Sequence, residues 1–73
     1  MATGALPLNL TVNGETRTFQ GVADVAGLVT ALGLDTKKLA VERNLEIVPR
    51  SAYGRTVLAD GDRIEIVHFI GGG

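Results

Sequence analysis

The chain has 73 residues, 45% of them hydrophobic, which suits one small domain with a dense core. It contains no cysteine and one histidine, which excludes a disulfide framework, a thiolate metal site and a cysteine nucleophile, and argues against a histidine-rich metal site. Seven basic side chains nearly balance eight acidic ones, and the sequence shows neither a signal-peptide pattern nor a membrane-length apolar run, so we expect a cytoplasmic protein without a nucleic-acid or membrane partner.

The N-terminal part of the sequence predicts a β-hairpin. Apolar and polar residues alternate from Leu6 to Val12, which is the period of a half-buried strand. Asn13 and Gly14 follow, and this pair is a strong signal for a tight hairpin turn because both residues tolerate positive φ. Residues 16–19 then predict the returning strand. Residues 1–5 precede the alternating pattern, and we expect them to form a flexible extension.

The next predicted element is a short helix. Asp24 precedes it and can accept a backbone N–H as the N-cap. Apolar residues then recur with helical spacing, at Val25, Leu28, Val29 and Leu32. Gly33 stands where a left-handed residue commonly ends a helix.

Three further strands are predicted in the second half of the chain. Residues 39–42 and 46–48 flank a turn, and Pro49 makes the second of these an edge strand or ends it, because proline cannot donate a ladder hydrogen bond. Residues 51–56 are expected to be irregular, with Tyr53 packed inward. The last strand covers residues 63–70.

The last strand alternates clearly between two faces. Ile64 and Ile66 share one face, whereas Val67 and Phe69 lie on the other. The order of strand, strand, helix and three strands predicts an α+β fold with a mixed sheet of four to five strands packed on one main helix, as in a β-grasp. We expect this domain to span residues 6–70 and to leave one sheet face open to solvent or to a partner.

The sequence offers little that resembles a catalytic site. Asp60 and Asp62 flank a glycine and are best interpreted as a polar turn rather than as a metal or acid–base pair. A lone strand histidine, His68, is more often packed or half-exposed than catalytic. The pair Lys37 and Lys38 is too small a basic cluster to specify nucleic acid.

The C-terminal segment is the feature that points to function. Gly71, Gly72 and Gly73 form a stalk without side chains, which we expect to be flexible and which a narrow enzyme channel could enclose from every side. Three extended residues reach about 10 Å, enough to enter the active site of another protein. Val67 and Phe69, on the open face beside this tail, would then form a docking patch. The alternatives are that the three glycines are only a frayed end or a cloning scar, and that loop residues cover Val67 and Phe69.

Two segments resemble the sulfur carrier protein of bacterial thiamine (thiazole) biosynthesis, a ubiquitin-like β-grasp family. They are Val41–Tyr53 and Asp60–Gly73, the second of which ends in Glu-Ile-Val-His-Phe-Ile-Gly-Gly-Gly. The resemblance covers Leu6–Gly73, and this ending is specific, whereas a Gly-Gly end alone would fit any ubiquitin-like modifier. Leu45 is a departure, because glycine is common in such turns.

The resemblance implies a carrier rather than an enzyme. An E1-like adenylating partner would use ATP and magnesium to convert the Gly73 carboxylate into an acyl-adenylate. A persulfide from a sulfurtransferase or cysteine desulfurase would then displace AMP, and the resulting thiocarboxylate would deliver sulfur to thiazole synthase. Gly71 and Gly72 would thread into the partner, and Val67, Phe69 and Ile70 would dock. The resemblance implies no cofactor or metal on the carrier itself.

Other interpretations of the same features remain open. The small subunit of molybdopterin synthase also resembles this fold and ends in Gly-Gly, and related carriers feed cysteine synthesis. A ubiquitin-like modifier would be joined through Gly73 to lysines of its targets. A plain interaction domain would dock without using its tail.

Overall fold

The computed structural model describes residues 7–69. It contains five strands, one α-helix and two 3-10 helices: β1 (Leu8–Val12), β2 (Glu15–Phe19), α1 (Val25–Ala31), η1 (Thr36–Lys38), β3 (Leu39–Arg43), β4 (Glu46–Val48), η2 (Arg50–Arg55) and β5 (Arg63–His68). The predicted hairpin, helix and three later strands are therefore all present. The first strand begins at Leu8 and the last ends at His68, while the expected strand ends at Leu6 and Ile70 lie outside the described residues.

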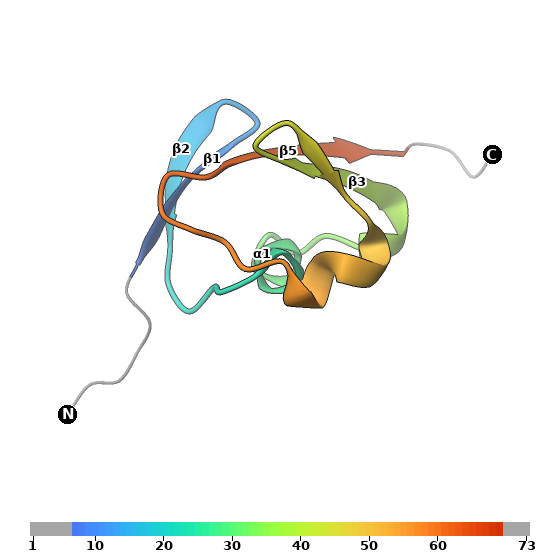
Figure 1. The fold of residues 1–73 in the computed structure, drawn as a ribbon, viewed down its shortest axis with the longest axis horizontal. Helices are drawn as coiled ribbons and strands as arrows, with labels where there is room; N and C mark the ends of the chain where they lie inside the picture. The colour runs from blue at the N-terminus through green and yellow to red at the C-terminus, as the bar shows by residue number, and fades with distance from the viewer. Residues whose placement is uncertain (1–6, 70–73) are drawn as a thin grey trace.

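All five strands form one mixed sheet in the order β2-β1-β5-β3-β4. β5 is the central strand, parallel to β1 and antiparallel to β3. The hairpins β1–β2 and β3–β4 complete the two sides of the sheet. Figure 1 shows α1 and η2 together on one side of this sheet. The fold is thus the expected α+β ubiquitin-like β-grasp, a five-stranded sheet packed on one main helix.

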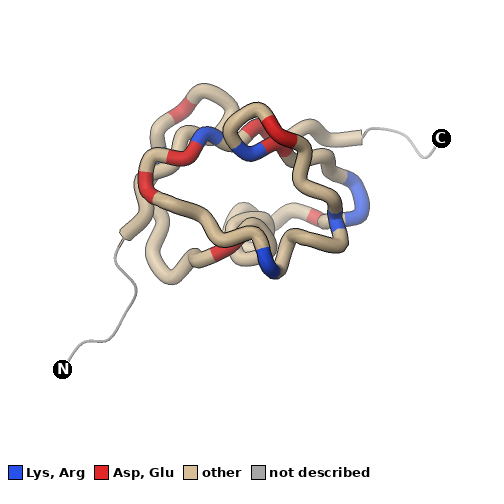
Figure 2. Tube along the Cα trace, viewed as in Figure 1, with Lys and Arg blue, Asp and Glu red and all other residues tan. Residues whose placement is uncertain are grey.

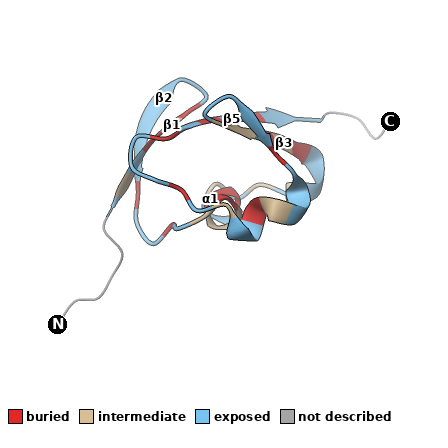
Figure 3. Ribbon diagram, viewed as in Figure 1, coloured by how far each residue is buried: buried red, intermediate tan, exposed pale blue. Residues whose placement is uncertain are grey.

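The hydrophobic core fills the space between the sheet and α1. The colouring of Figure 3 shows that buried positions of the strands and of α1 lie on the inside of the molecule. Burial of apolar area is the main favourable term in folding a domain of this size. The core side chains are Leu10, Val12, Phe19, Val22, Val25, Leu28, Val29, Leu39, Val41, Val48, Tyr53, Leu58, Ile64 and Ile66.

Helix α1 begins and ends as its capping residues predict. The Asp24 side chain accepts a hydrogen bond from the Gly27 N–H at 2.8 Å, which satisfies one of the free donors at the helix start. Gly33 has φ +72°, and its N–H donates to the Thr30 carbonyl at 2.9 Å. This left-handed residue turns the chain back toward β3.

The two 3-10 helices were not predicted, and the expectation of irregular structure over residues 51–56 was wrong. In η2 the Ala52 N–H donates to the Pro49 carbonyl at 2.8 Å, and the Thr56 hydroxyl donates to the Ala52 carbonyl at 2.7 Å. These local hydrogen bonds stabilise the 3-10 conformation of a segment whose sequence predicted irregular structure. Tyr53 within η2 does pack inward as expected, and burial raises its pKa.

The side chain of Asn13 extends the pairing of β5 beyond the end of β1. The parallel ladder joins β1 to β5 only at its beginning, with Val12 opposite Ile64. At Asn13 the chain turns away with φ +50°. The Asn13 side chain then accepts from the Ile66 N–H at 2.7 Å and donates to the Ile66 carbonyl at 3.1 Å, so that an amide side chain replaces the missing backbone partner.

Asp62 joins the turn before β5 to the end of β3. It is 7% exposed, and its carboxylate accepts hydrogen bonds from the Ala59 N–H, the Asn44 amide and the Arg43 guanidinium at 2.8, 3.0 and 2.8 Å. Burial alone would raise the pKa of Asp62, but the hydrogen bonds from Ala59, Asn44 and Arg43, together with the positive charge of Arg43, lower it below its ordinary value.

This geometry predicts an acid-sensitive contribution to stability. Because the pKa of Asp62 is lower in the folded state, its contribution is complete above the unfolded value near 3.8 and is lost as the pH falls through the folded value. We expect Asp62→Asn to reduce the free energy of unfolding by about 1–3 kcal/mol at pH 7, because it weakens a buried charge-assisted network. The difference from the unsubstituted protein should shrink toward pH 2.

Urea unfolding at pH 7 and at pH 2 to 4 measures this effect. Glu15→Gln is the control, because Glu15 is an exposed carboxylate that makes no ion pair within residues 7–69. Equal stability of the Asp62→Asn and unsubstituted proteins at pH 7 would contradict the role given to Asp62.

The β3–β4 turn holds a leucine in a conformation that suits glycine. Asn44 has φ +52° and Leu45 has φ +72°, as a two-residue hairpin turn with both central residues in the left-handed region requires. Leucine is strained there because its Cβ crowds the backbone. The Leu45 side chain is 80% exposed, so burial compensates for little of that strain.

We therefore expect Leu45→Gly to raise the free energy of unfolding by about 1 kcal/mol through relief of backbone strain. Gly14→Ala is the mirror control, because Gly14 has φ +84° in the β1–β2 turn and a Cβ built there meets no atom within 4 Å. It should destabilise the protein through backbone strain alone. Denaturant unfolding of both variants tests the pair, and a loss of stability in Leu45→Gly would show that the leucine side chain contributes more than its strain costs.

Candidate functional site

The residues predicted to dock a partner lie at the end of the central strand. Val67 is in β5 and Phe69 is the residue after His68, and each side chain is 58% exposed. Ile64 and Ile66, on the opposite face, are buried. The exposure that a docking role for Val67 and Phe69 requires is therefore present. The other predicted site residues, Ile70, Gly71, Gly72 and Gly73, lie outside the described residues.

The backbone hydrogen bonds of β3 hold the end of β5 in place. The Phe69 N–H donates to the Lys38 carbonyl at 2.9 Å, and His68 lies opposite Leu39 in the antiparallel register. Pairing thus continues one residue past the end of β5. β3 therefore holds the chain in the sheet as far as Phe69, the last described residue.

The structure adds residues from β3 and β4 to this surface. Ala40 lies directly opposite Val67, and Ile47 of β4, which is 75% exposed, lies opposite Glu42 on the same sheet face. A surface hollow of about 350 Å³ lies beside Phe69. Its lining includes Lys37, Ala40, Ile47, Pro49, Arg50 and Phe69. We call Ala40, Ile47, Val67 and Phe69 the apolar patch.

Ile47 and Ala40 could not be placed on this patch from the sequence. Residues 46–48 predict a strand, but only the pairing of β3 with both β4 and β5 brings Ile47 and Ala40 to the face of Val67. The available signal was the alternation within each strand, which assigns faces but not neighbours.

The polar residues considered as catalytic candidates either form hydrogen bonds within turns or are exposed at the surface. The turn assigned to Asp60 and Asp62 is confirmed, since Asp60 accepts from the Asn9 N–H at 2.7 Å and Asp62 is engaged as described above. Lys37 and Lys38 are exposed in η1, where the Asp35 side chain accepts from the Lys37 N–H at 2.9 Å. His68 is exposed at the end of β5. Within residues 7–69, no three His, Asp or Glu side chains are grouped as metal ligands would be.

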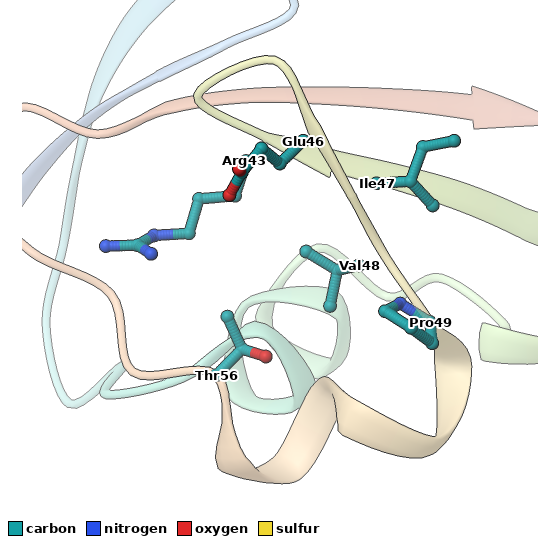
Figure 4. A pocket seen from close by; sticks show the side chains of 6 residues that line it. All are labelled: Arg43, Glu46, Ile47, Val48, Pro49 and Thr56. Carbon is teal, nitrogen blue, oxygen red and sulfur yellow. The ribbon is translucent and has the colours of Figure 1, made fainter.

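A second hollow, of about 160 Å³, lies between β4 and the chain after η2. Figure 4 shows its lining, Arg43, Glu46, Ile47, Val48, Pro49 and Thr56. The Arg43 guanidinium, the one cationic group among these side chains, is already paired with Asp62 at 2.8 Å. The remaining groups do not form an obvious binding site for an anion or a catalytic pair.

Charge is mixed over the described part of the chain. Figure 2 shows Lys and Arg interspersed with Asp and Glu rather than gathered on one basic face. Such a distribution lacks the positive stripe that attracts nucleic acid. Across residues 7–69, none of the helices has the length and apolar character needed to cross a lipid bilayer.

The chain resembles known proteins of thiamine biosynthesis. The sulfur carrier protein ThiS of Bacillus subtilis is 38% identical over 65 residues, which are 88% of this chain and 98% of that protein. A crystal structure of the thiamine biosynthesis protein ThiS from Geobacter metallireducens superposes with a TM-score of 0.77 at 39% identity, over 90% of this chain and all of that one.

Other relatives are much longer than this chain. A thiazole synthase of Paramagnetospirillum magneticum is 53% identical over 66 residues, and one of Magnetococcus marinus is 44% identical. The chain covers 90% of its own length in these alignments but only 20% of theirs. The model of the ThiS family matches residues 10–73, which include the C-terminal glycines. With that match and the shared fold, this chain belongs to the ThiS family.

Proposed function

We propose that the chain is a sulfur carrier of thiazole formation in thiamine biosynthesis, with Gly73 as the sulfur-bearing residue. The main support is the match of the ThiS family over residues 10–73, which extends through the glycine tail. The exposure of Val67 and Phe69, on the strand that leads into the tail, is consistent with docking beside it. The proposal requires that the protein presents Gly73 as a free carboxyl end.

The proposed chemistry follows from the weakness of a carboxylate as an electrophile. An E1-like partner with ATP and magnesium would join the Gly73 carboxylate to AMP and release pyrophosphate, which removes the negative charge and supplies a leaving group. The terminal sulfur of a persulfide, on a sulfurtransferase or cysteine desulfurase, would then displace AMP. A thiol would cleave the remaining sulfur–sulfur bond and leave a thiocarboxylate on Gly73.

The carrier would contribute recognition and reach rather than catalysis. The sequence has no cysteine, so its own side chains offer no thiol to hold the sulfur. Asp62, the buried carboxylate, is occupied by Arg43 and Asn44. We therefore propose that acid–base groups, magnesium and ATP belong to the partner and that this chain is a protein co-substrate. Because ATP is the reagent, the proposed location is the cytoplasm.

The proposed acceptor of the sulfur is a thiazole synthase. Two relatives named thiazole synthase include a region similar to this chain, and that region makes up 20% of each of them. A carrier-like region in the same polypeptide as the acceptor enzyme supports their cooperation. The same family match favours thiamine biosynthesis over the pterin branch.

Docking through the apolar patch can be tested with two matched valine substitutions. Val67→Ala should weaken binding to the adenylating enzyme, and Phe69→Ala should weaken it by about 1 kcal/mol or more, as for an aromatic interface anchor. Val57→Ala is the control, because Val57 is 69% exposed but pairs with Asp24 near α1, away from the patch. Titration calorimetry measures all three. Equal affinity of Val57→Ala, Val67→Ala and Phe69→Ala would remove the patch from the interface.

The role of Gly73 can be tested by changing the chain end alone. Deleting Gly73, or adding one alanine after it, should abolish thiazole formation in a reconstituted assay, because the reactive carboxylate is removed or displaced. Thermal stability should stay the same, since both changes lie outside the packed residues 7–69. Thiazole formation by either variant at the normal rate would refute the proposed chemistry.

A further inference from the structure

We infer that the open sheet face carries an acidic docking point, formed by Glu42 and Glu65, that receives an arginine or lysine of the adenylating partner. This inference rests on the proposed function and adds a charge requirement to the apolar patch. The adenylating partner would therefore present a cationic side chain next to apolar side chains on its docking surface.

The two carboxylates lie directly across from each other. Glu42 of β3 and Glu65 of β5 are partners in the antiparallel register. Residues paired in this way project to the same sheet face with Cβ atoms about 5 Å apart. Glu65 is exposed and Glu42 is half-buried, so both face solvent on the side away from α1.

No described residue forms an ion pair with either carboxylate. Within residues 7–69 the only ion pair is between Arg43 and Asp62. Arg43 follows Glu42 in β3 and therefore lies on the other face of the sheet. Arg63 is on the same face of β5, two residues before Glu65, but forms no ion pair with either carboxylate.

Like charges placed directly opposite in a sheet destabilise it. The folded domain therefore carries an unfavourable pair at the middle of its open face. A cation from outside would relieve this repulsion, and a guanidinium, with five N–H donors, can engage both carboxylates at once. Charge complementarity thus identifies a basic partner surface.

The acidic pair is continuous with the apolar patch. Along β5, Glu65 lies about 7 Å from Val67 and about 13 Å from Phe69 on the same face. Ile47 flanks the pair from β4, since it lies opposite Glu42. A partner that holds Val67 and Phe69 while it receives the tail also brings its own side chains within reach of Glu42 and Glu65.

The test compares two double variants with the same change in net charge. Glu42→Gln/Glu65→Gln removes the paired charges and keeps the side-chain shape. Glu15→Gln/Glu46→Gln is the control, because these exposed carboxylates lie on the other sheet face, opposite Val12 and Arg43. The adenylating enzyme, ATP, magnesium and labelled pyrophosphate are supplied, and ATP–pyrophosphate exchange is followed at varied carrier concentration, because adenylation releases pyrophosphate and leaves AMP on Gly73.

We expect the KM for Glu42→Gln/Glu65→Gln to rise about fivefold to tenfold with kcat nearly unchanged, because the pair acts in docking rather than chemistry. The KM of the unsubstituted carrier should rise as salt is added, and that of this variant should rise much less. The melting temperature of the variant should be equal or higher, because repulsion is removed. The control should keep the KM of the unsubstituted carrier.

Each other result has a distinct meaning. An unchanged or lower KM in Glu42→Gln/Glu65→Gln, or an equal rise in the control, overturns the docking point but leaves the sulfur-carrier proposal standing. Failure of the unsubstituted carrier to be adenylated by an enzyme that is active on a known carrier overturns the proposed function, and the docking point with it.

Discussion

The position of β5 between β1 and β3 is the constraint on which the rest of the structure depends. β1 accompanies β5 only at its beginning, and the Asn13 side chain takes over by bonding both the N–H and the carbonyl of Ile66. On the other side β3 pairs with β5 along its whole length and as far as Phe69. A side chain that replaces a backbone partner keeps the buried polar groups of the central strand satisfied. The strand that leads into the tail is therefore firmly seated up to the last described residue.

This arrangement separates the two tasks of a carrier. One face of β5 places Ile64 and Ile66 in the core, and the other exposes Val67, two residues before the last described residue. One face of the strand thus contributes to stability, and the other face is free to contact a partner protein. The folded domain would orient the partner-binding face, and in the proposed mechanism it supplies no acid, base or metal ligand to the reactive carboxylate. Such a division suits the proposed carrier, which more than one enzyme would bind.

Local sequence patterns predicted most of the fold, but they did not predict the contacts between residues that are far apart in the chain. Alternation in β5, the Asp24 cap and the Asn13–Gly14 turn each depend on neighbouring residues, and each is present in the structure. The bonds of Asn13 to Ile66 and of Asp62 to Arg43 span 53 and 19 residues, so no local pattern contains them. The same holds for the apolar patch and for Glu42 opposite Glu65, because register between β3 and β5 creates both. Helix η2 escaped prediction for another reason, since bonds such as that of Thr56 to Ala52 stabilise a sequence with weak helical character.

Intact mass spectrometry can show directly whether Gly73 accepts sulfur. The chain ending at Gly73 would be incubated with its adenylating enzyme, ATP, magnesium and a sulfur source, and then fragmented to locate any change. We predict a mass gain equal to the replacement of one oxygen by sulfur, confined to Gly73. An unchanged mass, under conditions in which the same enzyme converts a known carrier, would contradict it, as would a gain located anywhere else in the chain.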